Sequence, residues 1–150
     1  MSEGSGVKRI PRRTGSRDAP VYEERTGDIV VRVVAAYSPD QSDPPENEFF
    51  WTYTVEIENH GQRTVQLVSR HWVITDALNR VQEVSGPGVV GEQPELKPAE
   101  AFRYTSGCPL GTPSGSMRGS YQMVSGEGES FDVAIPAFSL HLPGAGRVVN

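Results

Sequence analysis

Residues 86–91 have the spacing of a phosphate-binding loop. Gly86, Gly88 and Gly91 form a G-x-G-x-x-G pattern, in which glycines let the backbone approach a pyrophosphate and a helix N-terminus completes the anion site. A strand leads into this pattern, but Pro94 disfavours the helix that should follow it. Acidic residues also surround it with the wrong charge for a pyrophosphate: Glu83, Glu92 and Glu95. The pattern therefore indicates a tight loop between strands, and binding of a nucleotide or pyrophosphate there is the alternative.

The three histidines do not form a metal-binding motif. His60, His71 and His141 lack the H-x-H or H-x₃-H spacing that places two imidazoles on one metal. Residues 40–48 carry the carboxylates that Mg²⁺ prefers, but two prolines interrupt them, which favours a solvated acidic loop: Asp40, Asp43, Glu46 and Glu48. We predict no metal ligands and no cofactor, and a divalent metal belongs to the small-ligand alternative.

The single cysteine and the serines do not form a nucleophilic site with a histidine base. Cys108 precedes a proline at a strand end, where a small buried thiol is the ordinary interpretation. One cysteine cannot form a disulfide within the chain. Glu56 and Glu58 share the polar face of a strand, without any mark of an acid–base pair. We therefore predict that the chain has no catalytic residues and is not an enzyme.

Three arginines on predicted strands are candidates for anion binding. If Arg70, Arg103 and Arg118 lie outward in neighbouring positions, the cluster would bind a carboxylate or another anion. The alternative is that they are isolated surface arginines.

The elements that must position these residues are strands. Residues 49–59 alternate without interruption, with Trp51, Tyr53, Val55 and Ile57 on one face. Other alternating segments follow, separated by turn signals at the spacing of about 8–12 residues that is typical of β-sandwiches. We predict an all-β fold, an immunoglobulin- or fibronectin type III-like antiparallel β-sandwich of seven to nine strands, with Trp72 in the core.

Several details of this prediction concern turns and faces. Residues 59–63 are expected to form a hairpin turn between two paired strands. In the strand over residues 64–77, regular alternation places Leu67 and Trp72 on opposite faces. Residues 131–136 and 137–143 are expected to be two separate strands.

Three long stretches of the chain resemble the ApaG family. They are SRHWVITDALNRVQEVSGPGVVGEQPEL (69–96), FRYTSGCPLGTPSGSMRGSYQMV (102–124) and FDVAIPAFSLHLP (131–143), and the resemblance extends over about residues 28–143. It implies a fibronectin III-like sandwich. The family is similar to domains of eukaryotic F-box proteins and of a polymerase-delta-interacting protein, which implies a protein-binding module. Its bacterial members are linked to cobalt resistance and magnesium efflux.

The charge distribution indicates a domain with a tail. Residues 1–20 carry five basic and two acidic side chains, a net charge of +3, which leaves −8 for the rest of a chain whose total is −5. We expect a flexible basic N-terminal tail over residues 1–25, one domain over 26–145 and a C-terminal tail over 146–150. An acidic body disfavours specific nucleic acid binding. No apolar run has the length of about 20 residues that a membrane helix needs, so we expect a cytoplasmic protein without membrane insertion.

These observations together predict a non-enzymatic protein–protein interaction module with an unidentified protein partner. An exposed sheet edge or the loops over residues 40–48, 85–95 and 106–116 would make the contact. The link to divalent-cation homeostasis would then be indirect. Edge strands would also allow a homodimer.

Overall fold

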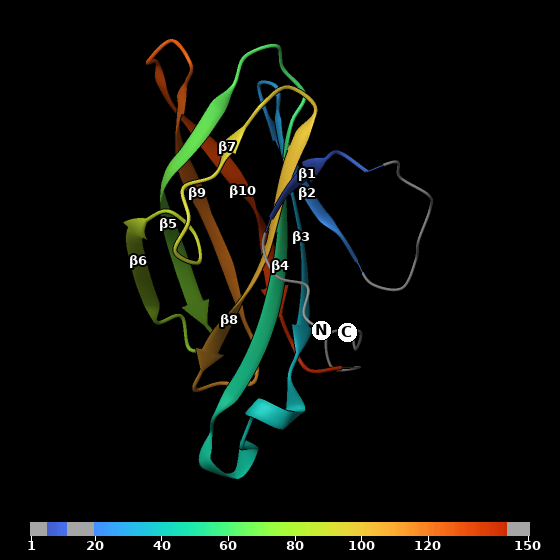
Figure 1. Ribbon diagram of the computed structural model, residues 1–150. Helices are drawn as coiled ribbons and strands as arrows, with labels where there is room; N and C mark the ends of the chain where they lie inside the picture. Colours follow the sequence, from blue (N-terminus) through green and yellow to red (C-terminus); the bar gives the residue numbers. More distant parts are fainter. Residues whose placement is uncertain (1–5, 12–19, 144–150) are drawn as a thin grey trace.

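The protein is a sandwich of two antiparallel sheets (Figure 1) in a computed structural model that describes residues 6–11 and 20–143. The first sheet contains, in spatial order, β1 (Gly6–Arg9), β8 (Glu100–Leu110), β4 (Phe49–Asn59), β3 (Ile29–Tyr37) and β2 (Tyr22–Thr26). The second contains β10 (Ser130–Leu140), β9 (Gly115–Ser125), β5 (Val65–Asp76) and β6 (Val81–Pro87), and β7 (Glu95–Leu96) pairs with β5. Two short 3₁₀ helices, η1 (Pro39–Gln41) and η2 (Pro44–Glu46), lie between β3 and β4. The predicted antiparallel β-sandwich is confirmed, although the described residues form ten strands where seven to nine were expected.

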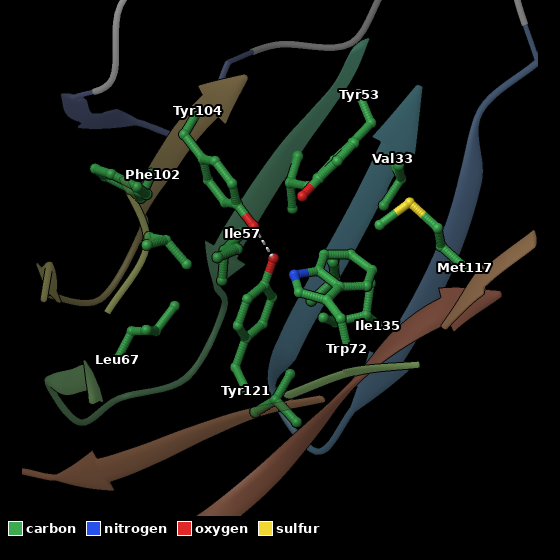
Figure 2. Close-up of a cluster of buried hydrophobic side chains, with 14 of the residues drawn as sticks. Val33, Tyr53, Ile57, Leu67, Trp72, Phe102, Tyr104, Met117, Tyr121 and Ile135 are labelled. Atoms are coloured by element: carbon green, nitrogen blue, oxygen red, sulfur yellow. Dashed lines mark hydrogen bonds between the residues drawn. The ribbon is translucent and has the colours of Figure 1, made fainter. Parts of the chain in front are cut away.

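The core lies between the two sheets and follows the alternation of β4. Trp51, Tyr53, Val55 and Ile57 are buried, as predicted, in one cluster with side chains of β5, β8, β9 and β10. Figure 2 shows this packing around Tyr53 and Ile57. Burying one large apolar side chain contributes about 1.5–3 kcal/mol. Trp72 contacts Tyr53 edge to face, with ring centroids 5.3 Å apart, and its predicted place in the core is confirmed.

A bulge in β5 overturns the regular alternation expected there. Leu67 pairs with Met123 while Ser69 pairs with the adjacent Gln122, so Val68 is an extra residue in the ladder. A bulge reverses which faces the following residues point to. Leu67 and Trp72, expected on opposite faces, are consequently both buried in the core.

The last two expected strands are one strand with a bulge. β10 runs from Ser130 to Leu140, and its register against β9 shifts between Ile135 and Phe138. Pro136 lies in this irregularity, where its missing N–H removes no regular ladder bond.

The hairpin expected at residues 59–63 is also wrong. β4 belongs to the first sheet and β5 to the second, so this connection crosses between the sheets. The Asn59 side chain holds it, because its amide donates to the carbonyls of Arg63 and Leu96 at 2.8 and 3.0 Å. These long-range contacts outweigh the local turn preference.

Two strands fall in or across the segment expected to be a tail. β1 pairs with β8, and β2 pairs with β3 and extends across the boundary drawn at residue 25. Residues 1–5 and 12–19, and the expected C-terminal tail at 146–150, lie outside the described residues.

The two sides of the sandwich differ. On one side β2 lies against β10, where the Thr26 hydroxyl accepts the N–H of Ala134 at 3.0 Å and Tyr22 bonds to Ser139 at 3.1 Å. On the other side β6 is the terminal strand of its sheet (Figure 1). There β1 covers only residues 100–103 of β8, and among the described residues no strand covers the edge over 104–110. The sandwich is closed on the first side and open on the second.

Candidate functional site

A pocket of about 330 Å³ lies at the open side of the sandwich. The first sheet contributes Tyr53, Tyr104 and Ser106 to its lining, and the second contributes Arg70 and Trp72. The glycine loop covers it with Pro87 and residues 89–91. The loop singled out from the sequence and a strand residue beside it therefore meet at one concave site.

Arg70 points inward, toward this pocket. It lies two residues before Trp72 on β5 and opposite Gly86 on β6. Its Nη1 donates to the carbonyl oxygens of Pro87 at 3.0 Å and Gly88 at 2.9 Å. No described Asp or Glu forms an ion pair with it, unlike Arg32 or Arg80. The loop thus holds a half-buried guanidinium in place without neutralising its charge.

The three glycines of the motif each have a role in this loop. Gly86 leaves room for the guanidinium, because a Cβ there would lie 3.1 Å from Nη1 of Arg70. Gly88 has a φ of +61°, and a Cβ on it would collide with the carbonyl oxygen of Glu92. Gly91 has a φ of +82° and follows Val90, whose φ is +41°. Two successive positive φ values are typical of a type I′ turn.

Three backbone N–H groups of the loop are already bonded within the protein. The N–H of Gly88 donates to Val68, and Val89 and Glu92 donate to each other's carbonyls, all at 2.8 Å. None of the described residues after the motif forms an α-helix. The geometry that lets a G-x-G-x-x-G loop cradle a phosphate, with N–H groups directed at the anion, differs from this arrangement.

Two phenols, those of Tyr53 and Tyr104, line the pocket, and a third, that of Tyr121, is bonded to Tyr104. Tyr104 and Tyr121 point toward each other across the two sheets, with their hydroxyls 2.5 Å apart (Figure 2). Burial raises the pKa of both, and burial also raises the pKa of Tyr53 against the lowering effect of its hydrogen bond with Ser106. The positive charge of Arg70 counteracts these shifts only weakly. The phenols therefore remain protonated at neutral pH and keep hydroxyls that can donate hydrogen bonds.

The candidate arginine cluster does not form. Arg103 lies on the outer face of the first sheet and Arg118 on the outer face of the second, while Arg70 points inward. A signal for Arg70 was present in the sequence, because a residue two positions from a core tryptophan on a strand shares its face. Tyr53, Tyr104 and Ser106 carried no comparable signal, because only the pairing of β4 with β8 brings them together.

The histidines lie apart. Nε2 of His60 is 2.8 Å from Glu58, and Nε2 of His71 is 2.8 Å from Glu83. Nδ1 of His141 is 3.1 Å from the hydroxyl of Ser139. Over residues 6–11 and 20–143, no group of three or more His, Cys, Asp or Glu side chains could hold a metal ion. The acidic loop over residues 40–48 forms η1 and η2.

Cys108 is buried, and burial raises the pKa of its thiol to about 11. It is therefore protonated at neutral pH, whereas the thiolate is the nucleophilic form.

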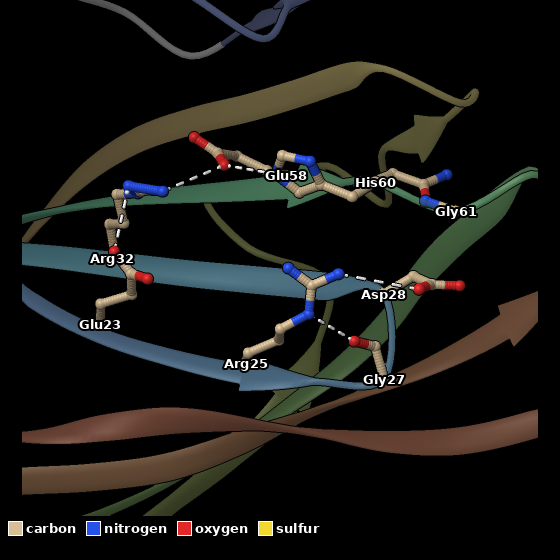
Figure 3. Close-up of polar contacts among 9 residues, drawn as sticks. Glu23, Arg25, Gly27, Asp28, Arg32, Glu58, His60 and Gly61 are labelled. Carbon is tan, nitrogen blue, oxygen red and sulfur yellow. Dashed lines mark hydrogen bonds and ion pairs between the residues drawn. The ribbon is translucent and has the colours of Figure 1, made fainter. Parts of the chain in front are cut away.

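Glu58 is buried, although it lies on the polar face of β4. Its side chain is only 1% exposed, and its carboxylate lies 3.5 Å from Arg32 and 2.8 Å from His60. Arg32 also contacts Glu23 at 3.2 Å (Figure 3). A buried carboxylate needs such partners. This ion-pair chain is a structural feature of the first sheet, since the pocket at Arg70 lies between the sheets.

Comparison with known proteins gives consistent matches. The family model of the ApaG domain matches residues 39–125. A protein called ApaG from Caulobacter vibrioides is 65% identical over 139 residues, which cover 93% of this chain and 99% of that protein. A protein called ApaG from Beijerinckia indica is 56% identical, over 87% of this chain and all of that protein. The crystal structure of the putative ApaA protein from Bordetella pertussis is 52% identical, with a TM-score of 0.77 over 79% of this chain and 96% of that one.

Proposed function

The chain belongs to the ApaG family, and from this premise we propose that it is a non-enzymatic protein-interaction module of the cytoplasm. In this proposal an extended segment of a partner protein pairs with the open edge of β6. Addition of a strand to a sheet edge is a common mode of peptide recognition, because main-chain hydrogen bonds supply affinity for any extended segment.

The observation that carries this proposal is the row of outward backbone groups on β6. Asp76 donates to Arg80 at one end of the β5–β6 ladder, and Gly88 donates to Val68 at the other. Hydrogen-bonded pairs alternate along an antiparallel ladder, so the even-numbered residues of β6 bond to β5. Val81, Glu83 and Ser85 consequently direct their N–H and C=O groups away from the sheet. Pro87 continues the same series, which fits the confinement of proline to sheet edges.

The residues around β6 favour a partner segment that carries both an apolar and an acidic residue. Leu78, in the turn before β6, and Val81, its first residue, are 65% and 60% exposed, so an apolar side chain of the segment would pack there. At the far end Arg70 offers a positive charge that no described carboxylate neutralises. A segment with an apolar residue toward one end and an acidic residue toward the other complements both features.

The edges at β2, β10 and β1 offer less. β2 and β10 cover each other, and β1 is only four residues long. β6 presents seven residues, and its burial pattern is exposed at most of them.

The state of the reactive groups supports the proposal that the protein is not an enzyme. The thiol of Cys108 is buried and protonated. Ser139 bonds to His141, but no described carboxylate is bonded to that imidazole, as a triad would require.

The link to cobalt resistance and magnesium efflux comes from the family resemblance, and we propose that it is indirect, through the partner protein. Two findings support this. The described residues contain no cluster suited to a metal ion, and they contain no helix long and apolar enough to cross a membrane.

A substitution that removes one outward N–H tests the docking edge. Ser85→Pro deletes that donor and leaves the β5–β6 bonds intact, whereas Ser85→Ala removes only the hydroxyl and keeps the N–H. Peptides selected from a displayed random library against the wild-type protein are the probe, and affinity is measured by fluorescence anisotropy. We expect Ser85→Pro to lose binding and Ser85→Ala to keep it, with both variants melting near the wild-type temperature.

Two results would overturn the proposal. Equal binding by both variants would place the peptide elsewhere. A wild-type dimer in sedimentation velocity that Ser85→Pro dissociates would assign β6 to self-association instead of a partner protein.

A further inference from the structure

We propose that the pocket beside Arg70 binds a carboxylate group on an apolar body, with the Arg70 guanidinium as its counter-ion. This inference shares Arg70 with the docking proposal, but it does not require a segment to pair with β6. It concerns the space between the sheets, which is lined by both.

The glycine loop binds the guanidinium of Arg70 through one nitrogen, and the other two nitrogens are available to a ligand. Both bonds from Nη1 go to carbonyl oxygens of the glycine loop. Neither Nε nor Nη2 has an acceptor among the described residues, although the guanidinium lines the pocket. Two neighbouring N–H groups in one plane match the two oxygens of a carboxylate. Because the loop fixes the guanidinium, little conformational entropy is lost when a ligand binds.

Hydroxyl groups line the same pocket. Tyr53 and Ser106 each contribute one, and they are paired across β4 and β8. Tyr104 also lines it, with its hydroxyl bonded to Tyr121. A protonated phenol or a serine hydroxyl can donate to a carboxylate oxygen, and hydrogen bonds to an ionised group are stronger than neutral ones.

The apolar side chains that line the pocket favour a ligand whose remaining part is apolar. Trp72 and Tyr53 form an edge-to-face pair beside the guanidinium, and Val89 and Val90 close the pocket from the loop. Its volume of about 330 Å³ is at the lower end of the range for small-molecule sites. An aromatic or aliphatic group of modest size would fill it.

The charge balance favours a carboxylate over a phosphate. Arg70 is the one cationic residue among those that line the pocket. A dianionic phosphate or a polyphosphate would need further cations or free backbone N–H groups. Here the N–H groups of Gly88, Val89 and Glu92 donate to carbonyl oxygens of the protein.

The carboxylate has two chemical sources, a free organic acid or the acidic group of a peptide. The direct test uses 3-phenylpropionate as the probe and 3-phenylpropionamide as its neutral control. Binding to the full chain is followed by tryptophan fluorescence and by NMR shifts of the Trp72 indole N–H. A second arm uses a short peptide that ends in phenylalanine with a free C-terminus, and the same peptide amidated.

Arg70→Met removes the charge and keeps the length of the side chain, and Arg118→Met makes the same change on the outer face of β9. We expect the acid to bind the wild type and Arg118→Met equally, to bind Arg70→Met at least about tenfold more weakly, and to bind better than the amide. Tyr53→Phe should also weaken binding, which keeps the test valid if Arg70→Met does not fold.

The two arms of the experiment distinguish a free organic acid from the acidic group of a peptide. Binding of the free acid alone assigns the pocket to a small organic acid, and binding of the peptide acid but not its amide assigns it to a peptide terminus. Either result supports the carboxylate site. Equal binding of acid and amide, equal affinity in Arg70→Met, or no shift with any carboxylate would overturn it. Since no arm involves β6, failure here is distinct from failure of the docking proposal.

Discussion

Arg70 and Gly86 face each other across β5 and β6, and the guanidinium fills the space that a side chain at residue 86 would need. A Cβ atom at residue 86 would lie 3.1 Å from Nη1 and 3.2 Å from Nη2. The same Nη1 atom bonds to the next two carbonyls of the loop. The first glycine of the motif therefore determines where an arginine lies, and the motif and Arg70 form one structural unit.

Gly86→Val tests this unit. We expect the free energy of unfolding to stay within about 1 kcal/mol of wild type, because valine favours strands and the crowded atoms end a flexible side chain. The guanidinium should be displaced, so binding of 3-phenylpropionate should weaken about tenfold or more. Urea denaturation and NMR titration measure the two effects, and unchanged affinity would contradict the link between the two residues.

Gly88→Ala and Gly91→Ala distinguish the cost of a positive φ from the added cost of a steric collision. Each places a Cβ in the left-handed region, which costs about 1–2 kcal/mol. At Gly91 the added atom meets open space, whereas at Gly88 it meets the carbonyl of Glu92, which already accepts the N–H of Val89. We expect Gly88→Ala to be the more destabilising change, beyond about 2 kcal/mol. Equal losses in denaturant midpoints would contradict this.

The sequence was sufficient for the fold because most strands obey local rules. β4 alternates from Phe49 to Ile57 without interruption, and this pattern alone predicts a half-buried strand. The core position of Trp72 and the tight turn at the glycine motif followed from similarly local signals. The resemblance to the ApaG family was confirmed by the comparisons.

The features that sequence reasoning missed depend on contacts between distant segments. The bulge at Val68 depends on how β5 pairs with β9, and it places Leu67 and Trp72 on the same face. The crossing at residues 59–63 depends on Asn59, whose side chain reaches Leu96. The pocket needs β4, β5, β8 and the glycine loop together. The pattern of residues within one segment does not indicate which distant segments it will pair with.

The Tyr104–Tyr121 pair should stabilise the protein as a unit. Tyr104→Phe or Tyr121→Phe leaves the other buried hydroxyl without its partner, which costs about 1–3 kcal/mol. The double variant removes both hydroxyls, so we expect it to lose less than the sum of the single changes. A double-mutant cycle from urea denaturation measures this coupling. Strict additivity would show that the hydroxyls act independently.

Nucleotides and divalent cations should leave the melting temperature unchanged. The loop N–H groups at Gly88, Val89 and Glu92 are bonded internally, and the described residues hold no metal cluster. A ligand at 100 times its Kd would stabilise the fold by about 2.7 kcal/mol, which calorimetry detects. The panel is ATP, GTP, pyrophosphate, Mg²⁺ and Co²⁺. A rise with ATP or pyrophosphate that Gly88→Ala abolishes, while that variant remains folded, would revive the nucleotide alternative.

Buried acidic groups should make the fold sensitive to alkali. Burial raises the pKa of Cys108 from its ordinary value of 9.0 to about 11, and burial raises those of Tyr53, Tyr104 and Tyr121 above 10.0. Above pH 9 the unfolded chain releases protons that the folded chain retains. The unfolded state then binds fewer protons, so stability is full below pH 9 and declines as pH rises.

Cys108→Ala isolates the thiol's part of this decline. Between pH 9 and 10 the thiol is the first of these groups to lose its proton in the unfolded chain, because its ordinary pKa is the lowest. We expect the free energy of unfolding to fall less steeply over this interval in Cys108→Ala than in wild type, whatever the variant's stability at neutral pH. This difference in slope should persist to about pH 11, where the folded thiol also ionises. Above that pH both proteins should lose stability together, because the tyrosines are common to both. Parallel curves from pH 8 to 11 would show that the thiol is ionised as easily in the folded as in the unfolded protein.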